Sequence, residues 1–321
     1  MYFIKAIETI GHQPSFSNRG FAQHLLPAHE NVMHPDYKQY INAVTLRRMS
    51  NILRMAVACA SETLVQSSAE KADAIIVGTG LGCLHDTEKF LSNAILIKDS
   101  LLPPTSFIQS THNTMAGQIS LAMSNHCYNM THTQNMLSFE HAVADAMMFL
   151  DENGGNVLLG SADEYIPQLD AVLEYFKLND VMPTSGVSFL TVSKSETIGV
   201  KALLKAIDTF FGERISQNYV TNFLLKHQLT NAAVDLVLCS GKGSEEFLSN
   251  AGFGEVINFE KYTGRYSTSS AFALHLAVDL LSEEKNIFAG KKFQKEIKTV
   301  LICNMLHGKA TGLILVQKYE T

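Results

Sequence analysis

The chain has 321 residues, a formal net charge of −6 and a sequence pI near 6.0, so no basic surface for nucleic acid is expected. Its first residues lack the charged segment and apolar core of an export signal, and no apolar run reaches the roughly 18–20 residues of a membrane span. We therefore expect a cytoplasmic protein without a membrane span, whose scattered cysteines are reduced and buried: Cys59, Cys83, Cys127, Cys239 and Cys303.

Apolar periodicity in the first half predicts helices that alternate with buried strands. Leu46, Met49 and Leu53 begin a helical stripe, and Asn153-Gly154-Gly155 is typical of a helix end. The predicted elements are helix 45–66, strand 74–78, a helix from about residue 86, a break at Pro103-Pro104, helices 113–123 and 136–150, and paired strands 157–160 and 186–192.

The second half repeats this order. We predict helix 215–228, strand 235–239, helix 268–282 and strands 298–303 and 312–317.

Two segments, 75–82 and 236–243, share one pattern half a chain length apart. Each is an apolar run that ends in a glycine-rich turn, and Asp73 or Asp235 precedes it. Self-similarity of this kind indicates a repeated architecture. We predict two duplicated α/β halves, 1–195 and 196–321, that form one unit. Strands 74–78 and 235–239 should be buried and central, beside a pseudo-two-fold axis where the glycine turns meet.

Residues 100–139 contain no Asp, Glu, Lys or Arg, although they are rich in polar residues. Charges are almost never buried unpaired, whereas amides and hydroxyls can be satisfied by hydrogen bonds. This charge-free segment is therefore predicted to lie against protein, in a core, at a subunit interface or along a cavity. Its methionines are interpreted first as core and second as the lining for an apolar ligand: Met115, Met123, Met130 and Met136.

The order of these motifs resembles that of the β-ketoacyl synthases, condensing enzymes of fatty acid and polyketide synthesis. The resemblance implies a thiolase-like α/β fold of five layers, αβαβα, built from two duplicated halves. It also implies a dimer in which strands near the charge-free segment pair across the two-fold axis. It is carried by the turn 77–82, helix 113–120, Gly160-Ser161-Ala162-Asp163, strand 186–192, and Asn304 with Gly308 at the terminal glycine-rich turn.

The departures from that family concern its catalytic residues. Active members place a Cys at the strand-to-helix turn, where this chain has Thr133 or, with a slip of one residue, Gln134. The two family histidines are matched to Lys242 and Arg265, or to neighbours that are also not His. Lys and Arg attract anions but cannot replace a thiolate nucleophile. The resemblance therefore implies that the chain has no catalytic residue of its own.

This pattern resembles the chain-length factors, catalytically inactive partners of active ketosynthases. Residues 138–142 further resemble the small ketosynthase-like proteins of aryl-polyene and flexirubin-type pigment clusters. The resemblance implies an active ketosynthase subunit or a second copy as partner, together with an acyl carrier protein. Tunnel or interface positions are then expected at Asn113, Met115, Gln118, Met136 and Phe139.

The alternative is an atypical β-ketoacyl-ACP synthase or acyltransferase that uses Thr133 or Cys127. A hydroxyl nucleophile needs a positioned base, and His132 faces away from Thr133 if both lie in a strand. Cys127 is expected in a strand interior as a buried, inert thiol.

Two further patterns suggest ligands only superficially. Gly78, Gly80 and Gly82 suggest a dinucleotide fingerprint, but the third glycine comes one place early. Four histidines crowd one region without the spacing of a metal site, and we interpret them as polar core residues: His112, His126, His132 and His141. No cofactor and no metal are therefore expected.

Overall fold

The computed structural model describes residues 1–69, 71–96, 104–177, 180–196, 198–212, 215–283, 286–306 and 309–320. Pro103, Gly308 and the first residues of the charge-free segment lie outside the described residues. Within the described part of the chain, no helix is long and apolar enough to cross a membrane.

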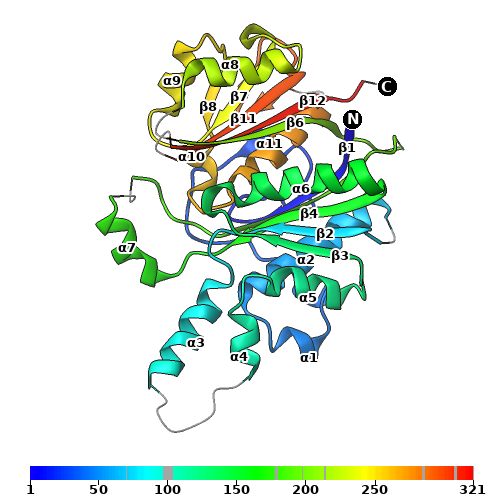
Figure 1. Ribbon diagram of the computed structural model, residues 1–321, viewed down its shortest axis with the longest axis vertical. Helices are drawn as coiled ribbons and strands as arrows, with labels where there is room; N and C mark the ends of the chain where they lie inside the picture. The colour runs from blue at the N-terminus through cyan, green and yellow to red at the C-terminus, as the bar shows by residue number, and fades with distance from the viewer. Residues whose placement is uncertain are drawn as a thin grey trace.

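The first half alternates strands and helices as predicted (Figure 1). Its elements are β1 Tyr2–Ile10, α1 Ala43–Leu46, α2 Asn51–Ser67, β2 Ala74–Gly78, α3 Leu84–Leu96, α4 Pro104–Gln109, α5 Thr114–Ala122, β3 Tyr128–His132, α6 Ser138–Asn153, β4 Asn156–Asp163, α7 Asp170–Tyr175 and β5 Gly186–Ser193.

The second half follows with a similar alternation. Its elements are β6 Ala202–Phe211, α8 Gln217–Lys226, β7 Leu236–Cys239, α9 Ser244–Asn250, β8 Val256–Asn258, α10 Glu260–Thr263, α11 Ser270–Ser282, the short pair β9 Ile287–Phe288 and β10 Lys291–Lys292, β11 Thr299–Leu306 and β12 Ala310–Lys318.

In each half of the large sheet, the strands follow the same order from the centre to the edge: β1-β5-β4-β2-β3 in the first half and β6-β12-β11-β7-β8 in the second. The large sheet runs β3-β2-β4-β5-β1-β6-β12-β11-β7-β8, so β1 and β6 meet at the centre and β3 and β8 form the edges. This order is what a duplicated chain would produce, and the division into 1–195 and 196–321 stays a prediction. β2 and β7 are fully buried and avoid the edges, as expected. Their expected place beside the axis is wrong, because β1 and β6 occupy it.

The two central strands, β1 and β6, were not among the predicted elements. The register of β1 against β5 shifts between Ile4 and Ala6. Such a bulge breaks the strict alternation by which a strand is recognised in a sequence. β1 and β6 pair only through their first residues, Tyr2–Ile4 and Ala202–Leu204, so each strand then continues past the start of the other.

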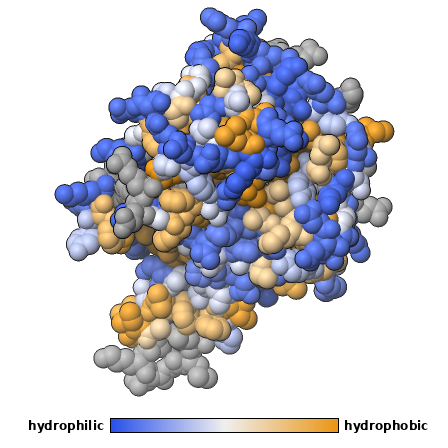
Figure 2. Space-filling model, turned by 45° about the horizontal axis from the view of Figure 1, so that its top comes forward, coloured by the Kyte–Doolittle hydropathy of each residue, from blue (hydrophilic) through white to orange (hydrophobic). Residues whose placement is uncertain are grey.

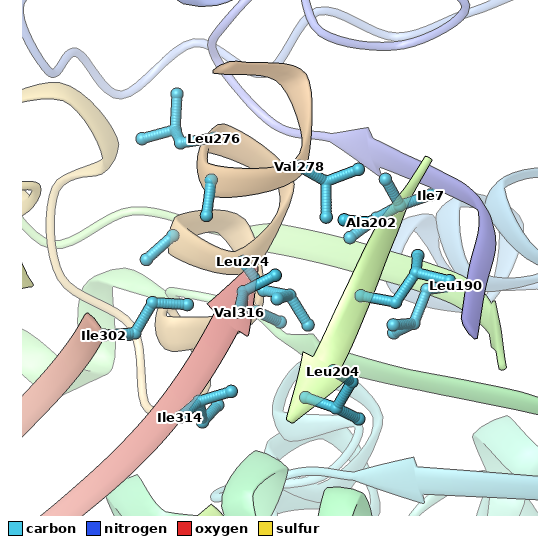
Figure 3. Packing of buried hydrophobic residues seen from close by; sticks show 14 of the residues in the cluster. Ile7, Leu190, Ala202, Leu204, Leu274, Leu276, Val278, Ile302, Ile314 and Val316 are labelled. Carbon is cyan, nitrogen blue, oxygen red and sulfur yellow. The ribbon is translucent and has the colours of Figure 1, made fainter. Parts of the chain in front are cut away.

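Three apolar clusters define five layers, as the resemblance implied. α2 and α5 cover the outer face of the first half-sheet, and α8 and α9 cover the outer face of the second. α6 and α11 lie between the half-sheets and pack against both. Figure 3 shows this middle layer, where Leu274 and Val278 of α11 point toward β1, β6 and β12. The fold is therefore the αβαβα arrangement of thiolase-like proteins.

The Asp that precedes each repeated strand performs the same task in both halves. Asp73 Oδ2 accepts a hydrogen bond from Asn156 N (2.8 Å), at the start of β4. Asp235 Oδ2 accepts hydrogen bonds from Lys298 N and Thr299 N (2.9 Å each), at the start of β11. β4 and β11 are the parallel neighbours of β2 and β7. Each Asp thus sets the register between its own strand and the next one in space.

Candidate active-site region

The strand-to-helix turn after β3 has its apex at Asn135. Thr133 and Gln134 are exposed residues of this turn, and Asn135 has a left-handed φ of 52°. Among residues with a side chain, Asn is one of those that best tolerate this conformation. Gln134 N donates to Ser138 Oγ (2.8 Å), which in turn donates to Asn135 O (2.6 Å). The apex of the turn, Asn135, thus lies two residues after Thr133 and one after Gln134, the predicted nucleophile positions. Its side chain is an amide.

No thiol lies at this turn. Cys127 precedes β3, whereas the turn follows it, and five strand residues at ~3.3 Å each place the two about 16 Å apart. Cys127 is exposed, so its predicted burial is wrong. The reason is that β3 is an edge strand, whose start lies at the surface. The other four cysteines are buried, and burial raises the pKa of the Cys83 and Cys303 thiols well above the ordinary value.

A buried carboxylate holds each glycine turn. Asp163 accepts hydrogen bonds from Thr79 Oγ1, Gly80 N and Leu81 N at 3.0 Å each, and from Thr268 Oγ1 at 2.8 Å. Glu260 Oε2 accepts a hydrogen bond from Gly241 N (2.8 Å). Both turns therefore converge on the segment 260–268. A Cβ on Gly80 would lie 2.3 Å from Ser267 Cβ, so this contact requires glycine.

The two positions matched to the family histidines have different surroundings. Lys242 is exposed on the second glycine turn. Arg265 is largely enclosed, and its guanidinium donates to Glu260 Oε1 (2.9 Å) and to Asp180 Oδ1 (2.8 Å). Burial lowers the pKa of Arg265, but these ion pairs outweigh it and the net shift is upward. Arg265 thus joins the segment 260–268 to Asp180 through ion pairs within the chain.

A buried polar network, which the sequence did not predict, lies beneath the turn. Ser240 Oγ donates to Asn304 Oδ1 (2.8 Å), and Asn304 Nδ2 donates to Met136 O (2.9 Å) and Glu140 Oε1 (2.8 Å). Burial raises the pKa of Glu140 to about 7, against the hydrogen bond from Asn304. The network ties the turn to the ends of β7 and β11. The signal in the sequence was a polar residue at the end of each of two apolar runs, Ser240 after β7 and Asn304 in β11.

The predicted tunnel residues do not form one wall within the single chain. Met115 packs in the outer layer beneath α2, whereas Phe139 packs in the middle layer on the opposite face of the sheet. Met136 is buried at the turn, Asn113 is exposed and Gln118 is partly buried on α5. The structure brings only Met136 and Phe139 close to the turn.

The predicted polar core histidines lie at or near the surface, so that expectation is wrong. His112 and His126 are exposed, and His132 and His141 are partly buried. His132 Nε2 lies 2.9 Å from Asp145 Oδ2, at the edge formed by β3. Among the described residues, no group of three His, Cys, Asp or Glu is placed to hold a metal ion.

A family model described as the N-terminal domain of β-ketoacyl synthase matches residues 22–201, more than half of the chain. The chain belongs to the β-ketoacyl synthase family. No curated protein matches it by sequence.

Solved structures of this family share the fold. The first is titled as a type II polyketide synthase acyl-carrier protein in complex with its ketosynthase, AntDE:AntF; it is 16% identical, with TM-score 0.75 and 99% of both chains covered. The ishigamide ketosynthase/chain length factor is 12% identical, with TM-score 0.74 and 99% of both chains covered. The ketosynthase ApeO with its chain length factor ApeC from Xenorhabdus doucetiae is 17% identical, with TM-score 0.51, 66% of this chain and 84% of that one covered. At such identities the likeness concerns the fold alone.

Proposed function

We propose that this β-ketoacyl synthase family member is a non-catalytic subunit of the chain-length-factor type. The observation that carries the proposal is the turn after β3, where Thr133, Gln134 and Asn135 stand and no thiol is present. Acyl transfer by this family's chemistry needs a thiolate there. Arg265, at one of the two histidine positions, is already bonded to Glu260 and Asp180. Its charge therefore stabilises the chain itself, which favours a structural role over oxyanion binding.

The edge strand β3 is the surface that we propose for the partner. β3 pairs with β2 on one side only, and its residues from Tyr128 to Met130 are exposed. An exposed apolar edge strand invites pairing with another chain. Met130 is 39% exposed and Leu121, on the neighbouring α5, is 71% exposed. A partner strand that continues the sheet would cover both side chains.

A projecting arm enlarges this apolar surface. α3 and α4 extend from the body of the molecule in Figure 1, and Figure 2 shows apolar side chains gathered on the arm. Ile95 is 74% exposed and Phe107 is 58% exposed. Much of the described charge-free segment is exposed in the single chain, which argues against a core position and favours an interface. We expect that interface to exceed the roughly 2,000 Å² at which obligate interfaces begin.

The partner that we propose is an active, Cys-containing ketosynthase, with an acyl carrier protein delivering the growing chain. Titles of structures with this fold name a ketosynthase with its chain length factor and a ketosynthase with its acyl-carrier protein. The segment Ser138–Ala142 supports an aryl-polyene or flexirubin-type pathway within this proposal. In such a pair Met136 and Phe139 would limit the length of the product.

One contact favours the alternative, an acyltransferase with a non-standard nucleophile. His132 and Asp145 form a pair of the kind that orients a general base, and Thr133 follows His132 directly. Among the described residues, however, Thr133 and His132 share no hydrogen bond. A competent nucleophile should contact its base, so we rank this reading second.

Two measurements test the proposal. In the first, the isolated protein is incubated with acyl-loaded carrier protein and its intact mass is measured. We expect no added acyl group. A covalent adduct that Thr133→Ala or Cys127→Ala abolishes would establish the alternative instead.

The second measurement mixes the chain with a Cys-containing ketosynthase from the same organism and follows complex formation by native mass spectrometry. Met130→Lys should weaken the complex at least tenfold, whereas Leu225→Lys, on the exposed face of α8 in the other half, should not. Alkylation of Cys127, the one exposed cysteine of the five, should slow when the partner binds. Unchanged binding by Met130→Lys together with unprotected Cys127 would exclude the β3 edge as the interface.

A further inference from the structure

A cavity of about 200 Å³ lies near the centre of the molecule's long sheet, beside the part of β1 that continues past the start of β6. The edge of β1 beyond Ile4 faces residues 18–19, residues 199–201 and the last turns of α11. Ile7 and Val278 give the cavity an apolar side, and Figure 3 shows both next to Ala202. The cavity shares no residue with the turn after β3, so the inference is independent of the proposed function.

Two buried carboxylates in its wall are already occupied. Glu8 is 3% exposed and accepts a hydrogen bond from Ser17 N (2.6 Å). Asp279 accepts hydrogen bonds from Gly20 N (2.6 Å) and Ala22 N (3.0 Å). Glu8 thus holds the segment 17–22 against β1, and Asp279 holds it against α11.

Two cations in the same wall have no such partner. Lys201 and Arg19 both line the cavity, and neither forms an ion pair or a side-chain hydrogen bond with any residue that the structure describes. Burial lowers the pKa of Lys201, while Glu8 and Asp279 oppose that shift from a distance. A partly desolvated ammonium without a hydrogen-bond acceptor is costly. An anion in the cavity would remove this cost.

A third polar group of the wall is also incompletely bonded. His275 is 5% exposed, and its Nδ1 lies 2.9 Å from Thr9 Oγ1. Its other ring nitrogen has no partner among the described residues. Burial, together with the nearby Lys201 charge, lowers the pKa of His275 to about 3. The ring is therefore neutral and can offer one further hydrogen bond to a ligand.

The geometry points to a binding site for a small carboxylate with one negative charge and a short alkyl chain, held by Lys201 and Arg19 and assisted by His275. The volume limits the size, because about 200 Å³ is the space of roughly seven waters at ~30 Å³ each. The carboxylates of Glu8, Asp279 and Glu283 in the wall disfavour a dianion. Val200, which is partly exposed in the wall above the buried Ile7 and Val278, provides an apolar surface for the alkyl chain.

Butyrate is the probe for the experiment, with inorganic phosphate and chloride at equal ionic strength for comparison. Calorimetric titration of the wild-type protein should show saturable butyrate binding that phosphate and chloride do not reproduce. Lys201→Met and Arg19→Gln should each weaken it at least tenfold, which corresponds to about 1.4 kcal/mol. Lys205→Met, on β6 and outside the cavity wall, should bind as the wild type does.

Arg19 is exposed, so its replacement keeps the test available if Lys201→Met does not fold. Three results would overturn the inference. The first is that Arg19→Gln binds butyrate as tightly as the wild type does. The second is that phosphate binds more tightly than butyrate. The third is that the wild-type protein gives no saturable butyrate signal.

Discussion

Replacing Glu140 by Gln should change how the stability of this protein depends on pH. Glu140 is fully buried, and its Oε1 accepts a hydrogen bond from Asn304 whereas Oε2 has no partner in the described part of the chain. Burial raises the pKa of this carboxyl from 4.5 to about 7, with the Asn304 hydrogen bond opposing. Gln keeps the shape of the side chain and its acceptor, but it carries no charge at any pH.

The sign and size of the effect follow from proton linkage. Between pH 4.5 and 7 the folded protein keeps a proton on Glu140 that the unfolded chain has released. The free energy of unfolding must therefore fall as the pH rises through this window. A pKa change from 4.5 to about 7 corresponds to about 3 kcal/mol. Glu140→Gln should remove a decline of that size and should be at least as stable as the wild type at pH 8.

The assay is guanidinium unfolding at several pH values from 5 to 8. Glu152→Gln, an exposed position on the same helix, is the matched control and should leave the pH profile unchanged. Part of the decline should persist in Glu140→Gln, because burial also raises the pKa values of Glu8 and Glu164 to about 7. Parallel profiles for wild type, Glu140→Gln and Glu152→Gln would refute the reasoning.

Three further substitutions test contacts inside the chain by denaturant unfolding. Arg265→Ala leaves Glu260, which is 2% exposed, without its ion pair and should lower the free energy of unfolding by about 3–5 kcal/mol. Adding Glu260→Gln to this variant should recover much of that stability. No recovery would contradict the ion-pair argument. Gly160→Ala places a Cβ 2.1 Å from the Phe189 ring, so the free energy of unfolding should fall by about 1–3 kcal/mol. The double variant with Phe189→Leu should lose less than the sum of the two single losses. Purely additive losses would argue against the clash. Asn135→Val should be about 1–2 kcal/mol less stable than Asn135→Gly, because the left-handed φ of 52° at this position is strained for a β-branched residue. Equal stabilities would mean that the turn relaxes.

The elements that the sequence predicted well are those with a strong local signal. β2 and β7 are unbroken apolar runs, and β4 and β5 contain short apolar runs between small or polar residues. α6 carries a clear helical stripe. Asp73 and Asp235 have equivalent contacts, since each accepts a backbone hydrogen bond at the start of the parallel strand next to its own. The family, too, followed from the order of motifs along the chain.

Other expectations failed because they depended on neighbours in space. The predicted burial of Cys127 depended on its place in a strand, and that of the histidines on the absence of metal-site spacing. β3 lies at an edge, where polar and apolar side chains alike reach the surface. β1 escaped prediction because its bulge disrupts the alternation. The turn after β3 could be located only to within two residues, since its apex is defined by the backbone conformation of Asn135.

The sequence by itself determined the family, the αβαβα class and the absence of a thiol from the turn, because all three depend on residue identity and order. Only the tertiary structure decided that Arg265 is bonded to Glu260 and Asp180, and that Asn304 joins the turn to Glu140 and Ser240. Asn304 and Glu140 are 164 positions apart in the chain. Such contacts arise when two half-sheets close on a shared layer of helices, and no local pattern of residues encodes which side chains then meet.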